Sequence, residues 1–342
     1  MYFNKDTVIS DTFSLNHDST LNIDNSFNIA YGIDKNFIFG CGISIASILL
    51  HNKDMKFTFH IFTDEFSNSD IKEFKELSQQ YNTQIVIYIV DCEELKSLPS
   101  TKNWSYATYF RFIIADYFYG NLDTLLYLDA DIVCKGKLIA LEKLDLNHSL
   151  AAVVTEGEKE WWEKRANALG NKSISHGYFN AGFLLINIEK WGAEDISGQA
   201  INLLSSDEIK RKISFLDQDI LNLLLIDKVV FLEKDYNTQY SINYELKCKK
   251  NKKYAHGIRN ETIFIHYIGP TKPWHEWAVY PSCHYFNIAK NDSPWKDFRL
   301  KSALSTSQFR YCSKHEMHQG KILKSISSKI KYLLKRSKIF SF

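Results

Sequence analysis

Several features that would mark an unusual class of protein are scarce in this sequence. Its 342 residues include only 14 Gly and 5 Pro, which excludes collagen-like and proline-rich chains. Its six cysteines are scattered without a Cys-x-x-Cys pair, so they indicate neither a zinc site nor a disulfide framework. No apolar run approaches the ~18 residues of a membrane-spanning helix, and the N-terminus lacks the order of a signal peptide. We therefore expect a cytoplasmic, reduced protein.

Several catalytic motifs are missing as well. The chain contains no Gly-x-Ser-x-Gly elbow and no Walker loop, which sets aside acyl transfer and P-loop chemistry. Gly40-Cys41-Gly42 is not followed by a third glycine, because position 45 is Ile, so the dinucleotide-binding fingerprint fails.

The composition that remains is that of a folded protein with an uneven charge distribution. Hydrophobic residues make up 45% of the chain and aromatic residues 14%, while the net charge is only +2, which excludes disorder. Residues 317–342 hold seven basic residues and no acid, leaving 35 basic against 40 acidic residues elsewhere. A mildly acidic globule therefore carries a basic tail, which is typical of proteins with an anionic partner.

Apolar segments with strand and helix periodicity alternate along the chain, which predicts an α/β fold with a mostly parallel sheet. Residues 1–26 are polar and aperiodic, and we expect a loose extension there. The predicted strands are 28–33, 56–62, 85–90, 124–128, 182–188, 229–232 and 262–267, and the predicted helices are 38–50, 71–81, 107–117 and 217–225. In such sheets ligands bind beyond the carboxyl ends of the strands.

Asp129-Ala130-Asp131 follows one of these strands directly. Two carboxylates one residue apart at a strand end can reach the same hard cation, such as Mg²⁺ or Mn²⁺, which shares its oxygen ligands with phosphate. On spacing alone, acids that cap or solvate a turn explain the motif equally well. Asp217-Gln218-Asp219 is a second instance of the same pattern.

His266 ends another predicted strand and precedes a loop with Gly269 and Lys272. A histidine beside two aspartates would complete an N/O site that Mn²⁺ accepts, and Lys272 offers a point charge suited to phosphate. Two other residues have ordinary structural explanations beside the functional one: Asp34 as a helix N-cap, and Asn180 as a turn residue.

The C-terminal segment combines lysines with apolar residues spaced about four apart. This pattern predicts a basic amphipathic helix that lies in the headgroup plane of a membrane, and the alternative is a terminal helix packed on its own domain. The apolar positions are Ile322, Leu323, Ile326, Ile330, Leu333 and Leu334.

Six short motifs stand in order between residues 27 and 300: 30–37 (AYGIDKNF), 109–112 (YFRF), 126–131 (LYLDAD), 178–182 (YFNAG), 217–222 (DQDILN) and the 266–275 loop. In this order they resemble the metal-dependent, retaining glycosyltransferases of family 8, above all the enterobacterial lipopolysaccharide core α-1,3-hexosyltransferases. The resemblance implies a GT-A type fold, a Rossmann-like mixed sheet flanked by helices. It implies a nucleotide-binding half at 27–135, a donor-sugar and acceptor half at 136–300, and a membrane-associating tail at 301–342.

The resemblance also implies roles for individual residues. Asp129, Asp131 and His266 would bind Mn²⁺ or Mg²⁺, with Ala130 between them in the UDP-sugar site. Gly32, Asp34 and Asn36 would hold the uridine and ribose. Arg111, Asn180, Asp217 and Gln218 would lie near the donor sugar, and Gly269 and Lys272 would steady the diphosphate. One departure stands after the strand near 154, where Thr155 and Glu156 occupy the place of an expected sugar-binding acid.

The catalytic residues implied are Gln218, Asp219 and Lys272. Retention usually suggests a carboxylate nucleophile, but the family position beneath the anomeric carbon is the amide Gln218. We therefore expect leaving-group departure and attack on one face of the sugar, with Asp219 as the alternative nucleophile.

The expected function is transfer of galactose or glucose from a UDP-sugar to the lipopolysaccharide core, through an α-1,3 linkage or alternatively a 1,2 linkage. The expected setting is the inner face of the cytoplasmic membrane, without a nucleic-acid partner. A haloacid-dehalogenase-type phosphatase also fits Asp129-Ala130-Asp131, but the chain contains neither Asp-Asp nor Gly-Asp for its later acidic cluster. A non-catalytic glycan-binding protein would instead use Trp274, Trp277 and Trp295 as stacking platforms.

Overall fold

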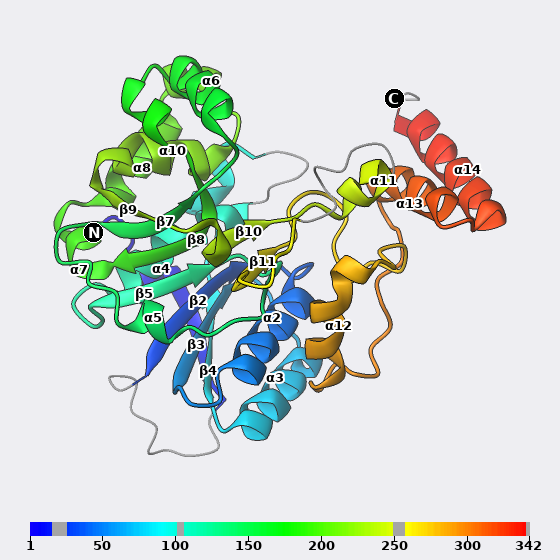
Figure 1. The fold of residues 1–342 in the computed structure, drawn as a ribbon. Helices are drawn as coiled ribbons and strands as arrows, with labels where there is room; N and C mark the ends of the chain where they lie inside the picture. Colours follow the sequence, from blue (N-terminus) through cyan, green and yellow to red (C-terminus); the bar gives the residue numbers. More distant parts are fainter. Residues whose placement is uncertain (16–25, 101–105, 249–256, 340–342) are drawn as a thin grey trace.

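The computed structural model describes residues 1–15, 26–100, 106–248 and 257–339. Figure 1 shows a central sheet with helices on both faces and a helical hairpin that projects from one side.

The main sheet has eight strands in the order β1-β4-β3-β2-β5-β8-β7-β9. The pairs β2–β3, β3–β4, β2–β5 and β7–β9 are parallel, whereas β1–β4, β5–β8 and β7–β8 are antiparallel. The strands are β1 (Ile9–Ser14), β2 (Phe27–Ile33), β3 (Phe57–Thr63), β4 (Gln84–Val90), β5 (Thr124–Leu128), β7 (Ala151–Thr155), β8 (Phe179–Asn187) and β9 (Val229–Leu232). The mixed sheet flanked by helices that the sequence predicts is thus confirmed.

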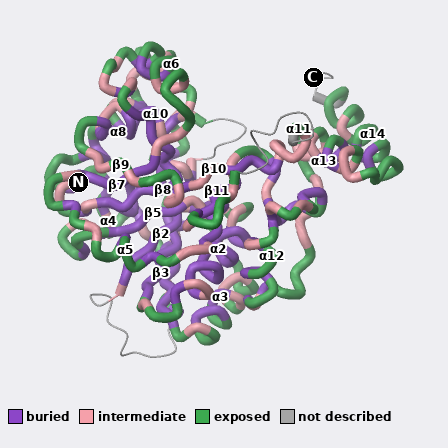
Figure 2. Tube along the Cα trace, in the orientation of Figure 1, coloured by how far each residue is buried: buried purple, intermediate pink, exposed green. Residues whose placement is uncertain are grey.

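Helices cover the sheet because its inner strands are apolar on both faces, as continuous hydrophobic runs predict. One core packs α2 (Ile38–His51), α3 (Asn68–Tyr81) and α12 (His284–Asn291) against one face. The other core packs α4 (Phe110–Phe118), α7 (Ile188–Ala193), α8 (Ile196–Ser205) and α10 (Leu216–Leu225) against the opposite face. Figure 2 shows these strands and the helix sides that face them as buried. Other helices of the body are α5 (Ile139–Glu142), α6 (Lys159–Leu169) and α9 (Asp207–Lys212).

A small second sheet brings two distant segments together. Its order is β10 (Thr238–Gln239), β11 (Phe264–His266) and β6 (Ile132–Cys134). β11 runs antiparallel to β6, and this register pairs His266 with Ile132. Because Ile132 directly follows the Asp129-Ala130-Asp131 turn, the register sets His266 beside that turn.

The chain ends in a hairpin of α13 (Thr306–His318) and α14 (Ile322–Ile339), coloured orange to red in Figure 1. α13 begins with a capping box between Ser305 and Gln308. α14 turns small residues toward α13, since Ser325 Oγ donates to the Ser313 carbonyl at 2.7 Å and Cys312 Sγ lies 3.5 Å from Ser328 Oγ. None of the described helices combines the length and apolar character that crossing a membrane requires.

The expectation of a loose extension at 1–26 is wrong for the part of it that the structure describes. β1 pairs antiparallel with β4 and forms the edge of the sheet, and a short helix, α1 (Lys5–Val8), precedes it. The Asp116 carboxylate also accepts hydrogen bonds from the backbone N–H groups of Tyr2 and Phe3, both at 2.9 Å. The alternation in this segment is weak because β1 lies at the edge of the sheet and is mostly solvent-exposed.

The three tryptophans offered as glycan-stacking platforms are core residues. Trp274, Trp277 and Trp295 are each at most 3% exposed, so none presents a ring face to a ligand. The cysteines Cys41, Cys92, Cys134, Cys283 and Cys312 are buried and unbridged, as their spacing predicts.

Candidate metal centre and adjoining polar cluster

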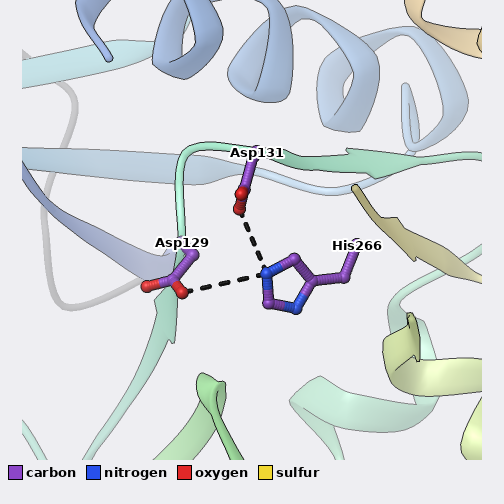
Figure 3. Close-up of side chains that lie close together, drawn as sticks. All are labelled: Asp129, Asp131 and His266. Carbon is purple, nitrogen blue, oxygen red and sulfur yellow. Dashed lines mark ion pairs between the residues drawn. The ribbon is translucent and has the colours of Figure 1, made fainter. Parts of the chain in front are cut away.

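Asp129, Asp131 and His266 lie together beyond the carboxyl end of β5, as Figure 3 shows. His266 Nε2 is 3.1 Å from Asp131 Oδ1 and 3.9 Å from Asp129 Oδ2. The three candidate ligand atoms all lie within 4.8 Å of one another. The turn is held by backbone bonds: Asp129 N donates to the Gly182 carbonyl at 2.8 Å, and Tyr267 N donates to the Asp131 carbonyl at 3.0 Å.

A chain of hydrogen bonds determines which nitrogen of His266 carries its proton. Gly182 N–H donates to Asn180 Oδ1 at 3.0 Å, and this bond identifies which end of the Asn180 amide is the oxygen. Asn237 Nδ2 donates to the same oxygen at 3.1 Å, so Asn237 Oδ1 is the atom that faces His266 Nδ1, at 3.1 Å. An amide oxygen only accepts, so Nδ1 must donate. The lone pair of a neutral His266 therefore lies on Nε2 and points toward the two carboxylates.

Like the His266 lone pair, a carboxylate oxygen of this cluster lacks a hydrogen-bond donor in the described part of the chain. Asp131 Oδ1 is buried and has no hydrogen-bond donor among the described residues. Burial alone would raise the pKa of Asp131, but its charged surroundings, the Lys272 ammonium first among them, outweigh burial and lower the pKa well below its usual range. An ionised carboxylate oxygen and an imidazole lone pair that face each other without a proton between them suit a divalent cation.

Gly182 leaves room for this cluster. A Cβ at this position would lie 2.5 Å from His266 Cε1 and 2.6 Å from Asp129 Oδ2, so the side chains can converge only over a glycine. The donor set of two carboxylates and one imidazole fits Mn²⁺ or Mg²⁺, with oxygen ligands from a phosphate able to complete the coordination.

Arg111 on α4 ties the cluster to a second acidic residue. Its guanidinium lies 3.3 Å from Asp129 Oδ1 and 3.1 Å from Asp217 Oδ2, and the side chain is almost fully buried. Burial opposes the charge, but Asp217 and the neighbouring groups raise the pKa of Arg111. Asp217 is also held by Thr108 Oγ1 at 2.5 Å. Arg111 and Asp217, which the resemblance assigns to the donor sugar, thus lie next to the metal turn.

Asn180 and Gln218 form one polar cluster with Glu156. Asn180 Nδ2 donates to Glu156 Oε2 at 3.0 Å and to Gln218 Oε1 at 3.1 Å. Gln218 Nε2 donates to the same Glu156 oxygen at 3.0 Å and to Tyr178 Oη at 3.1 Å. Glu156 therefore stands among the residues expected to contact a sugar.

Asp219 points away from this cluster into a closed set of donors. It is fully buried, and its carboxylate accepts from Arg165 at 2.7 Å, from Tyr178 Oη at 2.7 Å, and from the N–H groups of Ser214 and Phe215 at 2.7 and 2.8 Å. A carboxylate held by four donors is a poor nucleophile because its lone pairs are already engaged.

The opposite side of the metal turn is formed by the loop after β2. Asp34 Oδ1 accepts from Asn36 N at 2.8 Å in a turn, and the Asn36 carbonyl accepts from Lys301 Nζ at 2.8 Å. Gly32 is required by packing, because a Cβ there would lie 2.7 Å from Phe110 Cβ. The carboxyl ends of β2 and β5 thus present Asp34 and Asp129 along the same sheet edge.

The loop after β11 is held by the C-terminal hairpin. Lys272 Nζ contacts Asp131 and donates to the Tyr267 carbonyl at 2.8 Å, and Gly269 adopts a positive φ of 85° that suits glycine. Thr271 Oγ1 donates to Asn243 Oδ1 at 2.9 Å, and His315 Nε2 on α13 lies 2.8 Å from the same oxygen.

Sequence reasoning missed Asn237, Lys301 and His315, gave no role to Tyr178 although it quoted the motif that begins there, and left Glu156 without a partner. Glu156 follows a strand end and could be found by the same rule as Asp129. The other four act through contacts between segments far apart in the chain, for which the sequence carries no local signal.

Comparisons with known proteins agree along most of the chain. A family model described as "Glycosyl transferase family 8" matches residues 28–278, and one described as "Glycosyl transferase family 8 C-terminal" matches residues 280–336. The chain is 51% identical to lipopolysaccharide 1,3-galactosyltransferase of Salmonella typhimurium over 338 residues, covering 98% of both chains. It is 50% identical to lipopolysaccharide glucosyltransferase WaaO of Escherichia coli, covering 91% of both.

A solved structure supports the fold. The galactosyltransferase LgtC, in complex with donor and acceptor sugar analogues, superposes with a TM-score of 0.67 at 23% identity. The match covers 78% of this chain and 96% of that one. The GT-A type architecture expected from the motifs is confirmed.

Proposed function

The chain belongs to glycosyltransferase family 8 and is a hexosyltransferase, and from this premise we propose that it transfers galactose or glucose from a UDP-sugar to the lipopolysaccharide core with retention of the α configuration. The observation that carries the proposal is the convergence of Asp129, Asp131 and His266 at the strand-end edge where such folds bind nucleotides. Family membership sets aside the phosphatase and the non-catalytic alternatives.

The metal centre would hold Mn²⁺ or Mg²⁺ through Asp129, Asp131 and His266. The bound ion would supply positive charge against the charge that develops on the departing diphosphate. Lys272 supplies a second positive charge next to the metal ligands, with Nζ held between Asp131 and the Tyr267 carbonyl. Gly269 lets the backbone of this loop come close to the phosphates.

Gln218 and Asn180 orient the donor sugar, and Glu156 joins them as an acceptor of sugar hydroxyl protons. The side-chain amides of Asn180 and Gln218 both donate to the Glu156 carboxylate. A bound sugar would therefore replace some of these hydrogen bonds with bonds to its hydroxyl groups. Asp34 and Asn36 would contact the nucleoside. Arg111 holds Asp129 and Asp217 in place through its two ion pairs.

Asp219 has a structural role and does not attack the sugar, because its carboxylate already accepts hydrogen bonds from four donors. With an amide at 218 and the Asp219 carboxylate engaged by four donors, the acceptor attacks from the face that the diphosphate leaves, and a diphosphate oxygen takes the acceptor proton. Replacing Gln218 by Ala should lower turnover about tenfold or more, since it removes an orienting group. Near-wild-type turnover would refute its role.

The test of the activity is UDP release by the purified protein from UDP-galactose and UDP-glucose, with Mn²⁺ and then with EDTA. Core-truncated lipopolysaccharide is the acceptor, and NMR of the product distinguishes a 1,3 from a 1,2 linkage. Asp131→Asn should abolish metal-dependent release, while Asp123→Asn, an exposed acid at the other end of β5, should not. Release that is unaffected by EDTA and by Asp131→Asn would overturn the metal-dependent mechanism.

The C-terminal hairpin is proposed to hold the enzyme on the inner face of the cytoplasmic membrane. The apolar side chains of α14 at 322, 323, 326, 330, 333 and 334 are all about half exposed or more, between interleaved lysines. A protein ending after Gly320 keeps His315 and its contacts and should lose binding to anionic vesicles at low salt. Unchanged vesicle binding by the shortened protein would refute the role of α14.

A further inference from the structure

A groove opens where the hairpin meets α11 (Glu245–Cys248), away from the metal centre. Its volume is about 940 Å³, and both helices of the hairpin contribute to its walls. Figure 1 shows α11 beside α13, with α14 extending past both.

The groove combines exposed apolar side chains with positive charge. Met317, Ile326 and Ile330 line it and are 52%, 49% and 52% exposed, values that are high for large apolar residues. Lys247, Lys314 and Lys329 line it as well.

No acidic residue is among the described residues that line the groove. Glu245, the acid nearest to it on α11, is engaged elsewhere, because it accepts from Tyr240 Oη at 2.8 Å and from Ser282 Oγ at 2.6 Å. The lysines of the groove therefore have no neutralising partner within it.

A third feature is an imidazole with unused hydrogen-bonding capacity. His318 lines the groove, and its Nε2 atom is buried with no hydrogen-bond partner among the described residues. A buried ring nitrogen of this kind is costly unless a ligand or water completes it.

We propose that this groove binds the phosphate headgroup of an anionic phospholipid, with Lys247, Lys314 and Lys329 around the phosphate. Ile326 and Ile330 belong to the same exposed stripe of α14 that is proposed to lie on the membrane, so a lipid headgroup would continue into the groove from that surface. The inference rests on the proposed membrane association and adds to it one defined lipid site. A free phosphate ion would leave the apolar wall uncovered, which is why the occupant is an amphiphile.

The experiment compares two double variants that remove the same charge. Lys314→Gln with Lys329→Gln removes one groove cation from each helix of the hairpin. Arg310→Gln with Lys331→Gln also removes one cation from each helix, at positions that do not line the groove. The match extends to local packing, since each of the four cations lies over an aromatic ring.

Binding is measured by co-sedimentation with phosphatidylcholine vesicles, with and without phosphatidylglycerol. A diffuse electrostatic attraction predicts equal losses for the two double variants, because their charges are equal. The groove predicts that the Lys314/Lys329 variant loses about fivefold more affinity for phosphatidylglycerol vesicles than its control, the order of two weakened charge contacts. Equal losses overturn the groove while leaving the membrane role intact, and absence of binding by the unmodified protein overturns both.

A second measurement distinguishes the source of the phosphate. Short-chain phosphatidylglycerol below its micelle concentration should bind the unmodified protein by titration calorimetry, and the Lys314/Lys329 variant should bind it weakly. Inorganic phosphate that binds as tightly would overturn the assignment to a lipid. UDP release from the donor in solution should stay unchanged in both double variants, which separates a failure of the groove from a failure of the enzyme.

Discussion

Replacing Asn237 by alanine tests whether the metal-facing nitrogen of His266 is kept free of its proton by the surrounding hydrogen bonds. The substitution removes the oxygen that accepts from His266 Nδ1 and the amide that donates to Asn180. His266 can then place its proton on Nε2, where Asp131 Oδ1 lies 3.1 Å away and can accept it. The imidazole would bond to the carboxylate in place of a metal ion.

The expected magnitude follows from the usual effect of a histidine's outer hydrogen-bond partner on metal affinity. Outer hydrogen-bond partners of metal-bound histidines are typically worth about 10- to 100-fold in metal affinity, which corresponds to roughly 1.4 to 2.7 kcal/mol. We expect Asn237→Ala to weaken Mn²⁺ binding within this range. Asn237→Asp should bind Mn²⁺ at least as tightly as the unmodified protein, because a carboxylate still accepts from Nδ1.

The assay is direct Mn²⁺ titration in the presence of UDP, followed by the electron paramagnetic resonance signal of free Mn²⁺. Gln239→Ala, on the neighbouring strand β10, is the control and should leave the affinity unchanged. Circular dichroism melting checks that each variant is folded. A folded Asn237→Ala protein with unmodified Mn²⁺ affinity, or an equal loss in Asn237→Asp, would refute the tautomer argument.

Three further predictions concern the surroundings of the site. Gly182→Ala should weaken Mn²⁺ binding about tenfold or more in the same titration, because its Cβ would lie 2.5 Å from His266 Cε1. Asp219→Ala should lower the free energy of unfolding in urea by about 3 to 5 kcal/mol, because it leaves the buried Arg165 guanidinium without its partner; a stable but inactive protein would favour a catalytic role instead. Burial is the main cause that lowers the pKa of His315 to about 4 from its ordinary 6.5, so the folded state holds the neutral form. The stability that comes from burying neutral His315 is complete above pH 6.5 and is lost as the pH falls toward 4, because the unfolded chain then binds the proton more readily. His315→Gln should therefore make the free energy of unfolding depend less steeply on pH in this interval.

The sheet edge that carries the site could be predicted because its signals are local. Asp129 and Asp131 stand directly after a continuous apolar strand, and the strand predicted at 124–128 matches β5 residue for residue. His266 could be placed for the same reason, at the end of an apolar run. A continuous apolar run is sufficient to predict these strands, because the inner strands of a sheet covered on both sides are apolar on both faces.

The remaining parts of the site depend on pairing between distant segments. Asn237 meets His266 only because β10 and β11 pair in parallel, and two residues of β10 carry no recognisable pattern. β1 likewise takes its structure from the edge of β4, and the sequence of the strand alone is too polar to predict it. Asp219 shows the limit in the other direction: as an acid near an expected sugar site it was a candidate nucleophile, and only the position of Arg165 places it in the protein interior.

Of the two helices of the C-terminal hairpin, α13 bonds to the body of the enzyme and α14 packs on α13. α13 is anchored to the body of the enzyme, since His315 shares Asn243 with Thr271, next to Lys272, and Gln319 just beyond its end donates to the Trp277 carbonyl at 2.8 Å.

α14 joins α13 through Gly320, which adopts a φ of 76° with open space around it. Its polar contacts with α13 include one Ser325 hydrogen bond and the weak Cys312–Ser328 contact, and a hydrogen bond of this kind is worth about 1 kcal/mol. A membrane that holds α14, as proposed, would also hold the catalytic body, because α14 packs on α13 and α13 is bonded to the loop after β11 through Asn243 and Thr271.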